Sequence, residues 1–348
     1  MTPKEAVVAL INGMNLTSTQ METMVSEVMD GKASDAVIAA ILVLLRQKGE
    51  TIEEIYGAVN ALLRRVEKID LHPEAIDTCG TGGDASGTFN ISTVASIIAN
   101  AAGVKIAKHG NRSISSQCGS ADVLEALGIN INLNPEQTKA IFDKTSYAFL
   151  YAPNYHKAMK SVAKARRELG IRTIFNMVGP LANPALITRQ LVGVYDKELT
   201  GMFAQVLRQR GAEHCLVVNG ATKEGISLDE PNICGATYVS ELKNASVTSY
   251  TLHPEDFGFK RRRLEELQGG SLQESVKIVW DIVENRADEA KRDAAVYASG
   301  MAIYVGGKAE TMQEGFEKAK EVIETGKAKE ALVQLIEAHR SVTASPAA

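Results

Sequence analysis

Residues 79–93 read "CGTGGDASGTFNIST", with four glycines between the apolar run "AIDTC" (75–79) and the helical pattern "TVASIIANAAG" (93–103). A glycine-rich loop between a strand and a helix lets backbone N–H groups approach a phosphate, and the helix N-terminus adds positive dipole. The stretch therefore predicts an anion-binding loop at the carboxyl end of a strand. A purely structural turn is the alternative, although Asp84, Asn90 and Ser92 supply polar groups that a bare turn does not need.

Two well-known phosphate loops do not fit this stretch. A dinucleotide-binding GxGxxG pattern starting at Gly80 would need glycine at position 85, which is Ala85. A Walker A loop from Gly82 through Gly87 would need lysine at position 88, which is Thr88. The loop is therefore of another kind.

The composition is that of an ordinary globular protein, with 348 residues, 45% hydrophobic and 23% charged. A formal net charge of −4 gives no global attraction to nucleic acid or to an anionic membrane, so an anion site must be local. The four cysteines form no CxxC pair, which argues against a zinc site and a disulfide framework. We expect a cytoplasmic protein with no nucleic-acid partner and no membrane insertion.

The first 70 residues predict a small helical domain of four helices. Thr2 with Glu5, Thr17 with Gln20 and Thr51 with Glu54 have the spacing of capping boxes. After residue 74, β-rich runs alternate with helical patterns, which indicates an α/β domain with a mostly parallel central sheet. We expect a helical domain over 1–70, an α/β domain over 75–340 and a flexible tail over 341–348.

A second candidate anion loop follows the next predicted strand. The segment "KHGNRSISSQCGSADVLEALG" (108–128) carries Lys108, His109 and Arg112 among serines and glycines. Three potential cations beside a second strand end suggest a ligand with several negative charges. The alternative is a solvated loop in which Ser120 caps the following helix.

Two further segments could complete such a site. "SLDEP" (227–231) holds the adjacent carboxylates Asp229 and Glu230, which suit Mg²⁺ if phosphate oxygens lie nearby and are otherwise an ordinary surface feature. "RRELGIRTIFNMVGPLANP" (166–184) places arginines beside an apolar segment bounded by prolines. An aromatic carboxylate would require that combination, although a helix end followed by a hinge would look the same.

Together these motifs resemble the anthranilate phosphoribosyltransferases, the tryptophan-pathway branch of a family that also contains the pyrimidine nucleoside phosphorylases. The motifs occur in the family's order, and the similarity runs from the N-terminal helices to about residue 335. They are "GTGGD", "FNIST", "KHGNRS", "GSADVLEALG", "FLYAPNYHKAMK", "RRELGIRTIFN" and "GPLANP". The resemblance implies that part of 165–190 joins the helical domain, that the active site lies in the interdomain cleft, and that the protein is a homodimer.

The implied reaction transfers the phosphoribosyl group of phosphoribosyl pyrophosphate to the amine of anthranilate, with release of pyrophosphate. The residues implied to bind the donor are Gly80, Gly83, Asp84, Thr88, Asn90, Ile91, Ser92, Thr93, Lys108, His109, Gly110, Asn111, Arg112, Ser113, Ile114, Ser115, Ser116 and Ser120. Those implied for anthranilate are Gly80, Asn111, Arg166, His156 and Pro180. Ser92, Asp229 and Glu230 are implied to hold Mg²⁺.

No residue is expected to act as a general acid, a general base or a nucleophile, because an aromatic amine is already a neutral nucleophile at pH 7. The chain departs from the family around the acidic loop. Asn219 stands where a histidine is usual, and Ser227 stands where "GLDE" has its glycine, after a longer spacer. The structure must show what these changes do to the loop.

Two other functions stay open at this point. One is a nucleoside phosphorylase of the same fold, in which inorganic phosphate attacks a nucleoside. The other is a noncatalytic relative that binds nucleic acid through "KRRR" (260–263), although four cations followed by "LEEL" are more typical of a solvated helix start.

Overall fold

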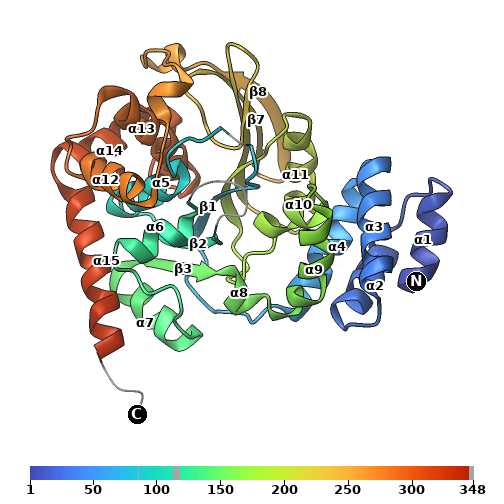
Figure 1. Ribbon diagram of the computed structural model, residues 1–348. Coiled ribbons are helices and arrows are strands. Elements are labelled where there is room, and N and C mark those ends of the chain that lie inside the picture. The colour runs from blue at the N-terminus through green and yellow to red at the C-terminus, as the bar shows by residue number, and fades with distance from the viewer. Residues whose placement is uncertain (85, 113–117, 345–348) are drawn as a thin grey trace.

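The computed structural model describes residues 1–84, 86–112 and 118–344. Figure 1 shows a group of N-terminal helices beside a larger part built around a β-sheet. The N-terminal helices are α1 (Pro3–Ile11), α2 (Ser18–Met29), α3 (Asp35–Lys48) and α4 (Ile52–Arg65). The fold class expected from the sequence is confirmed in both parts.

The helix starts form where the sequence predicts them. All three capping boxes are present, at Thr2, Thr17 and Thr51, and each hydroxyl accepts a hydrogen bond from the backbone N–H three residues on. A cap of this kind contributes about 1 kcal/mol to a helix. The caps can be predicted from the sequence because both partners lie within one turn.

The N-terminal helices share a hydrophobic core with two later helices, α9 (Lys160–Leu169) and α10 (Ile174–Leu181). Helix α9 packs against α2 and α3, whereas α10 packs against α3 and α4. Through this core, the segment that carries Arg166 is fixed to the helical domain. The domain boundaries at 70 and 75 remain predictions.

The sheet has the strand order β3-β2-β1-β4-β5-β7-β8, and β6 pairs with β5. Strands β1 to β5 run parallel, whereas β6, β7 and β8 are antiparallel additions. The strands are β1 (Ile76–Gly80), β2 (Ile106–Gly110), β3 (Tyr147–Tyr151), β4 (Arg189–Gly193), β5 (His214–Thr222), β6 (Ser227–Leu228), β7 (Gly235–Lys243) and β8 (Ser246–Leu252). The sheet is therefore mostly parallel, as expected.

The two faces of the sheet bury different cores. On β5, Leu216 and Val218 face the core that contains α5 (Ile91–Ala101) and α13 (Glu289–Val305). Cys215 and Val217 face the core formed by the N-terminal helices, α10 and α11 (Glu198–Gln209). The alternation follows from the period of two in a strand. Because both faces of the sheet are covered at these residues, the strand ends are the part of the sheet that a ligand could reach.

Most of the remaining helices lie on the side of the α/β part that is away from the N-terminal helices (Figure 1). They are α6 (Ser120–Ala126), α7 (Pro135–Thr145), α8 (Ala152–Tyr155), α12 (Leu272–Val283), α14 (Met312–Glu324) and α15 (Lys327–Ala344), with short 3₁₀ turns at Lys157–Met159, Pro254–Phe257 and Leu264–Leu267. Helix α15 ends at Ala344, and the flexible tail expected over 341–348 stays a prediction. Among the described residues, no helix is long and apolar enough to cross a bilayer.

The sheet changes its direction of winding between β1 and β4. From β1 the chain proceeds outward through β2 to β3, whereas β4 and β5 lie on the other side of β1. At this point the strand ends are paired, with Gly80 beside Gly193. In open α/β sheets such a switch point is where ligands bind. The glycine-rich loop begins at this position.

Candidate functional site

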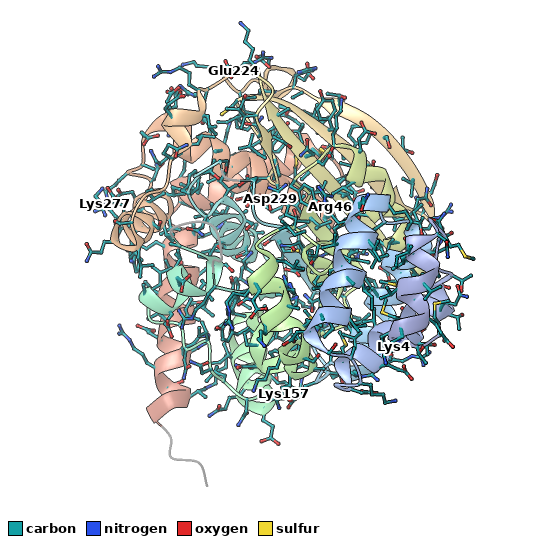
Figure 2. The ribbon with its side chains drawn as sticks, turned by 45° about the vertical axis from the view of Figure 1, so that its right-hand side comes forward. Lys4, Arg46, Lys157, Glu224, Asp229 and Lys277 are labelled. Carbon is teal, nitrogen blue, oxygen red and sulfur yellow. The ribbon has the colours of Figure 1, made fainter. Side chains whose placement is uncertain are left out.

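Asp229 lies directly over the two paired strand ends, in the middle of the molecule (Figure 2), and only 8% of it is exposed. A Cβ atom on Gly80 would lie 2.9 Å from the Asp229 carbonyl oxygen and 3.0 Å from its Cγ, closer than real side chains pack. Glycine at the end of β1 therefore lets the acidic loop sit against the sheet. The resemblance implies that Gly80 lies against the substrates. The structure shows in addition that Asp229 lies against Gly80.

Hydrogen bonds tie the acidic loop to the glycine-rich loop. The Gly82 N–H donates to Asp229 Oδ2 at 2.5 Å, and the Asp229 N–H donates to Asp84 Oδ2 at 3.3 Å. Burial, together with the negative charges of Asp84 and Glu230, raises the pKa of Asp229 well above its usual range. Three carboxyl groups crowded in a buried space favour a cation among them.

Glu230 meets the start of α5. Its Oε1 accepts a hydrogen bond from the Ser92 N–H at 3.1 Å, and Asn90, the N-cap residue, makes no side-chain cap. The N-terminus of α5 thus receives an anionic group, as the helix dipole favours. Burial nevertheless raises the pKa of Glu230 to about 7. Ser92, Asp229 and Glu230, the expected Mg²⁺ ligands, therefore lie in one region.

These residues fit Mg²⁺ only as part of a larger ligand set. Within 1–84, 86–112 and 118–344, no group of three or more His, Cys, Asp or Glu side chains is arranged to hold a metal ion. Mg²⁺ bound beside a phosphorylated substrate takes one or two carboxylates and completes its shell with phosphate oxygens and water. The donor set of Asp229 and Glu230 is of that type.

The side chain of Lys108 is buried between β1 and the start of α5 rather than exposed to solvent. It is 1% exposed; its Nζ donates to the Thr78 carbonyl and lies 3.4 Å from Ser92 Oγ. Burial lowers the pKa of Lys108, whereas the negative charges of Asp77 and Glu230 oppose that change. This ammonium group therefore lies beneath the first loop and links it to β2.

The second loop does not supply the three cations that its sequence suggests. Burial lowers the pKa of His109 to about 3, so its imidazole is neutral at pH 7. Arg112 is paired with Asp122 at 2.6 Å and with Glu125 at 2.7 Å, and both carboxylates belong to α6. The guanidinium has five N–H donors and gives one to each carboxylate, so the other donors could still contact a phosphate.

Ser120 does not cap α6, contrary to one of the sequence interpretations. The N-cap is Gly119, whose N–H donates to Asp122 Oδ2 at 2.9 Å, and Ser120 is the first helical residue. The Ser120 hydroxyl donates instead to the Asn111 carbonyl at 3.3 Å. Gly110 ends β2 at the same edge as Gly80. The expected donor residues Ser113, Ile114, Ser115 and Ser116 lie outside the described residues.

The other donor residues of the first loop differ in what they can offer. The side chains of Ile91 and Thr93 are buried in the protein, so only their backbone groups could contact a ligand. Thr88 forms a bridge with Gln268, and Asn90 Nδ2 donates to the Cys118 carbonyl at 3.2 Å. The resemblance implies that all four residues bind the donor substrate. In the structure, Ile91 and Thr93 could do so only through backbone groups, whereas Thr88 and Asn90 could also use their side chains.

His156 and Pro180 gather beside His109. The rings of His109 and His156 are 5.1 Å apart, and His156 Nε2 lies 2.9 Å from the Ala182 carbonyl oxygen. Burial lowers the pKa of His156 to about 4, so this imidazole is also neutral. The Pro180 carbonyl accepts a hydrogen bond from Gln190 Nε2 at 2.7 Å. Two uncharged imidazoles therefore lie next to the end of β2.

Arg166 is a desolvated cation. Burial lowers its pKa, its Cζ lies 5.6 Å from the centre of the Phe175 ring, and no carboxylate among the described residues is within ion-pair distance. Buried charges are normally paired, so an unpaired guanidinium beside an aromatic ring is suited to an anionic aromatic ligand. Asn111, the other polar anthranilate candidate, is exposed at the end of β2.

The two departures from the family pattern contact each other. Asn219 Nδ2 donates to Ser227 Oγ at 2.8 Å and to the Val194 carbonyl at 2.7 Å. The Ser227 hydroxyl donates in turn to the Tyr195 carbonyl at 2.7 Å. The altered residues therefore anchor the acidic loop to the segment after β4, directly before Asp229.

Sequence reasoning missed the buried support of the site. Asp77 Oδ1 accepts from the His109 N–H at 3.1 Å, and Asp77 Oδ2 accepts from Asn183 Nδ2 at 3.0 Å. Burial raises the pKa of Asp77 to about 6, and Lys108 opposes that shift. These contacts join β1, β2 and the "GPLANP" segment. A polar residue inside an apolar strand is the one sequence signal that could have revealed Asp77.

The four cations of "KRRR" are engaged with carboxylates. Lys260 and Arg262 contact Glu289, Arg261 contacts Glu255, and Arg263 contacts Glu266. The predicted helix start is a short 3₁₀ turn at Leu264–Leu267. Since their charges are balanced locally, these residues present no concentrated positive field to a nucleic acid.

Comparison with known proteins agrees with this arrangement. Residues 4–66 match the helical bundle domain of the glycosyl transferase family, and residues 72–329 match its a/b domain. Both parts of the chain thus define a two-domain glycosyl transferase. An anthranilate phosphoribosyltransferase of Chloroherpeton thalassium is 55% identical over 342 residues, which cover 98% of this chain and 99% of that protein.

Two solved structures share the fold. The anthranilate phosphoribosyltransferase of Thermus thermophilus has a TM-score of 0.90 at 36% identity, covering 96% of this chain and 99% of that one. The Saccharomyces cerevisiae enzyme in complex with PRPP (phosphoribosyl pyrophosphate) and Mg has a TM-score of 0.87 at 26% identity, covering 97% and 98%. The chain belongs to the anthranilate phosphoribosyltransferase family.

Proposed function

We propose that this protein transfers the phosphoribosyl group of phosphoribosyl pyrophosphate to the amine of anthranilate and releases pyrophosphate, as a step of tryptophan biosynthesis. The observation that carries the proposal is the meeting of three features at one switch point. They are the glycine-rich loop after β1, the acidic pair Asp229 and Glu230 above it, and the start of α5. A diphosphate with Mg²⁺ needs backbone donors and carboxylates side by side.

Ser92, Asp229 and Glu230 would hold Mg²⁺, which when bound would neutralise charge on the diphosphate leaving group. Asp229 carries a raised pKa in the free protein, and Glu230 has one of about 7, so both carboxyl groups favour a nearby cation. The Lys108 amine lies beneath the loop, where burial lowers its pKa and the negative charges of Asp77 and Glu230 favour its protonated form. Pyrophosphate departure leaves positive character on the ribose, so these charges stabilise the leaving side of the reaction.

Arg166 would receive the anthranilate carboxylate, with Phe175 supporting the guanidinium and with His156 and Pro180 beside the anthranilate ring. The amine needs no deprotonation before attack, which is consistent with neutral His109 and His156. The side chains therefore orient the two substrates, and the proton that the nitrogen loses after attack can pass to water or to the released pyrophosphate. Alignment of this kind can account for a large part of a rate enhancement.

The test is direct. Purified protein is mixed with anthranilate, phosphoribosyl pyrophosphate and Mg²⁺, and the loss of anthranilate fluorescence is followed. We expect a Mg²⁺-dependent loss that stops when either substrate is omitted. Phosphate-dependent cleavage of a pyrimidine nucleoside without any reaction of anthranilate would instead identify a nucleoside phosphorylase.

We further propose that the protein is a homodimer located in the cytoplasm. Analytical ultracentrifugation tests the dimer: a single species at the monomer mass of 37.4 kDa would oppose it.

A further inference from the structure

Arg172 contacts different elements from Arg166, although only six positions separate them. It lies in the turn between α9 and α10, and its Nη2 donates to the carbonyl oxygen of Gly83 in the glycine-rich loop. Its Cζ lies 4.2 Å from the centre of the Tyr195 ring. Arg166 therefore belongs to the region proposed for anthranilate, whereas Arg172 contacts the loop proposed for phosphoribosyl pyrophosphate.

The surroundings of this guanidinium are built for close contact. Gly83 has φ +76°, and a Cβ atom there would lie 3.3 Å from Arg172 Nε. Any larger residue would strain the backbone and crowd the guanidinium. Tyr195, which is 8% exposed, is fixed to the same loop because its N–H donates to Thr81 Oγ1 at 3.1 Å. The guanidinium thus lies between a buried ring and one peptide group.

That peptide group has a defined orientation as a result. The bond between Gly83 and Asp84 is trans, so its C=O and N–H point in opposite directions. With the carbonyl on Arg172, the Asp84 N–H points away from the guanidinium. This N–H makes no hydrogen bond to any residue that the structure describes, whereas the Asp84 carboxylate is held by the Asp229 and Ser86 N–H groups.

We propose that Arg172 is a positioning residue for the phosphoribosyl donor. It fixes the peptide between Gly83 and Asp84 so that the Asp84 N–H is presented to an oxygen of the diphosphate. This inference rests on the proposed function, and it extends that function to a residue outside the set that the resemblance implies. It also means that one short segment carries contacts to both substrates, through Arg166 and Arg172.

The experiment compares Arg172→Ala, Arg172→Lys and Tyr195→Phe with the unaltered protein. Arg167→Ala is the matched control, because Arg167 is an exposed arginine of the same segment. The KM for each substrate is measured by fluorescence, the Kd for phosphoribosyl pyrophosphate with Mg²⁺ by calorimetry without anthranilate, and the Tm by calorimetric scanning.

We expect Arg172→Ala to raise the donor KM and Kd by about tenfold, the effect of losing one charge-assisted hydrogen bond, while the anthranilate KM changes by less than about twofold. Arg172→Lys keeps the charge but loses the planar fork, so it should recover only part of the affinity. Tyr195→Phe keeps the ring beneath the guanidinium, so its effect should be smaller than that of Arg172→Ala, whereas Arg167→Ala should match the unaltered protein.

An equal or larger rise in the anthranilate KM, or an unchanged donor Kd in Arg172→Ala, would overturn the inference. A lower Tm with unchanged affinity would also overturn it, because the residue would then be merely structural. If Arg172→Ala does not fold, Arg172→Gln, which keeps a planar donor, provides the same comparison. Absence of any anthranilate reaction in the unaltered protein is a separate result, which counts against the proposed function.

Discussion

Replacing Arg166 with alanine tests the acceptor side of the site. The Arg166 side chain is half-buried, its pKa is lowered by desolvation, and it lies over Phe175 without an ion pair among the described residues. The free protein has therefore already accepted part of the desolvation cost of this charge. A carboxylate that arrives can form hydrogen bonds to a guanidinium that is already dehydrated and oriented.

The size of the effect follows from that geometry. Removing one partner of a buried, hydrogen-bonded charge pair costs about 2–4 kcal/mol, which corresponds to about a 30- to 1,000-fold rise in the anthranilate KM. The donor KM should change by less than about threefold. The variant should not be less stable by more than about 1 kcal/mol, because it removes an unpaired buried charge while it loses packing on Phe175.

The assay follows anthranilate fluorescence while anthranilate is varied at saturating phosphoribosyl pyrophosphate and Mg²⁺. It is then repeated while phosphoribosyl pyrophosphate is varied at saturating anthranilate. Urea denaturation of each variant gives the free energy of unfolding. Arg167→Ala is the control for a charge change in the same helix. Equal increases in both KM values would show that Arg166 does not recognise anthranilate, and so would an unchanged anthranilate KM.

Three more predictions concern the acidic loop and the histidines. Asp229→Asn should lower activity at least tenfold at limiting Mg²⁺. It should not lower the free energy of unfolding, because the raised pKa of Asp229 already disfavours its charged form. A Mg²⁺ dependence of activity equal to that of the unaltered protein would contradict this. Gly80→Ala should destabilise the protein by about 1–3 kcal/mol and displace the acidic loop, since its Cβ would crowd Asp229, and an undisturbed melting curve would oppose that explanation. His156, with its pKa lowered to about 4, binds more protons when unfolded, so its contribution to stability is complete above about pH 6.5 and is lost as the pH falls towards 4, by up to about 3 kcal/mol. His156→Gln should flatten this part of the stability curve in urea denaturation, and an identical slope would refute the assignment.

Local patterns account for what the sequence predicts well. Thr51 and Glu54 form a capping box because both partners lie in the first turn of α4, so their spacing alone identifies them. The position of the glycine-rich loop after a strand could also be predicted from neighbouring residues, because an apolar run directly precedes the loop. The failure at Ser120 is also local, because Gly119 competes for the same cap position and its N–H is satisfied by Asp122.

Contacts between distant segments could not be predicted in this way. The approach of Asp229 to Gly80 joins two segments far apart in the chain and depends on the order of the strands, which no periodicity encodes. The two arginines differ in the same respect. Arg166 and Arg172 look alike in the sequence, and only the packing of α9 and α10 directs one to Phe175 and the other to Gly83. The ion pairs of Arg112 likewise depend on the placement of α6.

The most direct test of the account is a crystal structure with phosphoribosyl pyrophosphate and Mg²⁺ bound. We predict that the diphosphate lies against the loop from Gly80 to Asp84, with the metal ion beside Asp229 and Glu230. A donor bound elsewhere, with Asp229 and Glu230 making no contact to the metal ion or to its water shell, would contradict the proposed site.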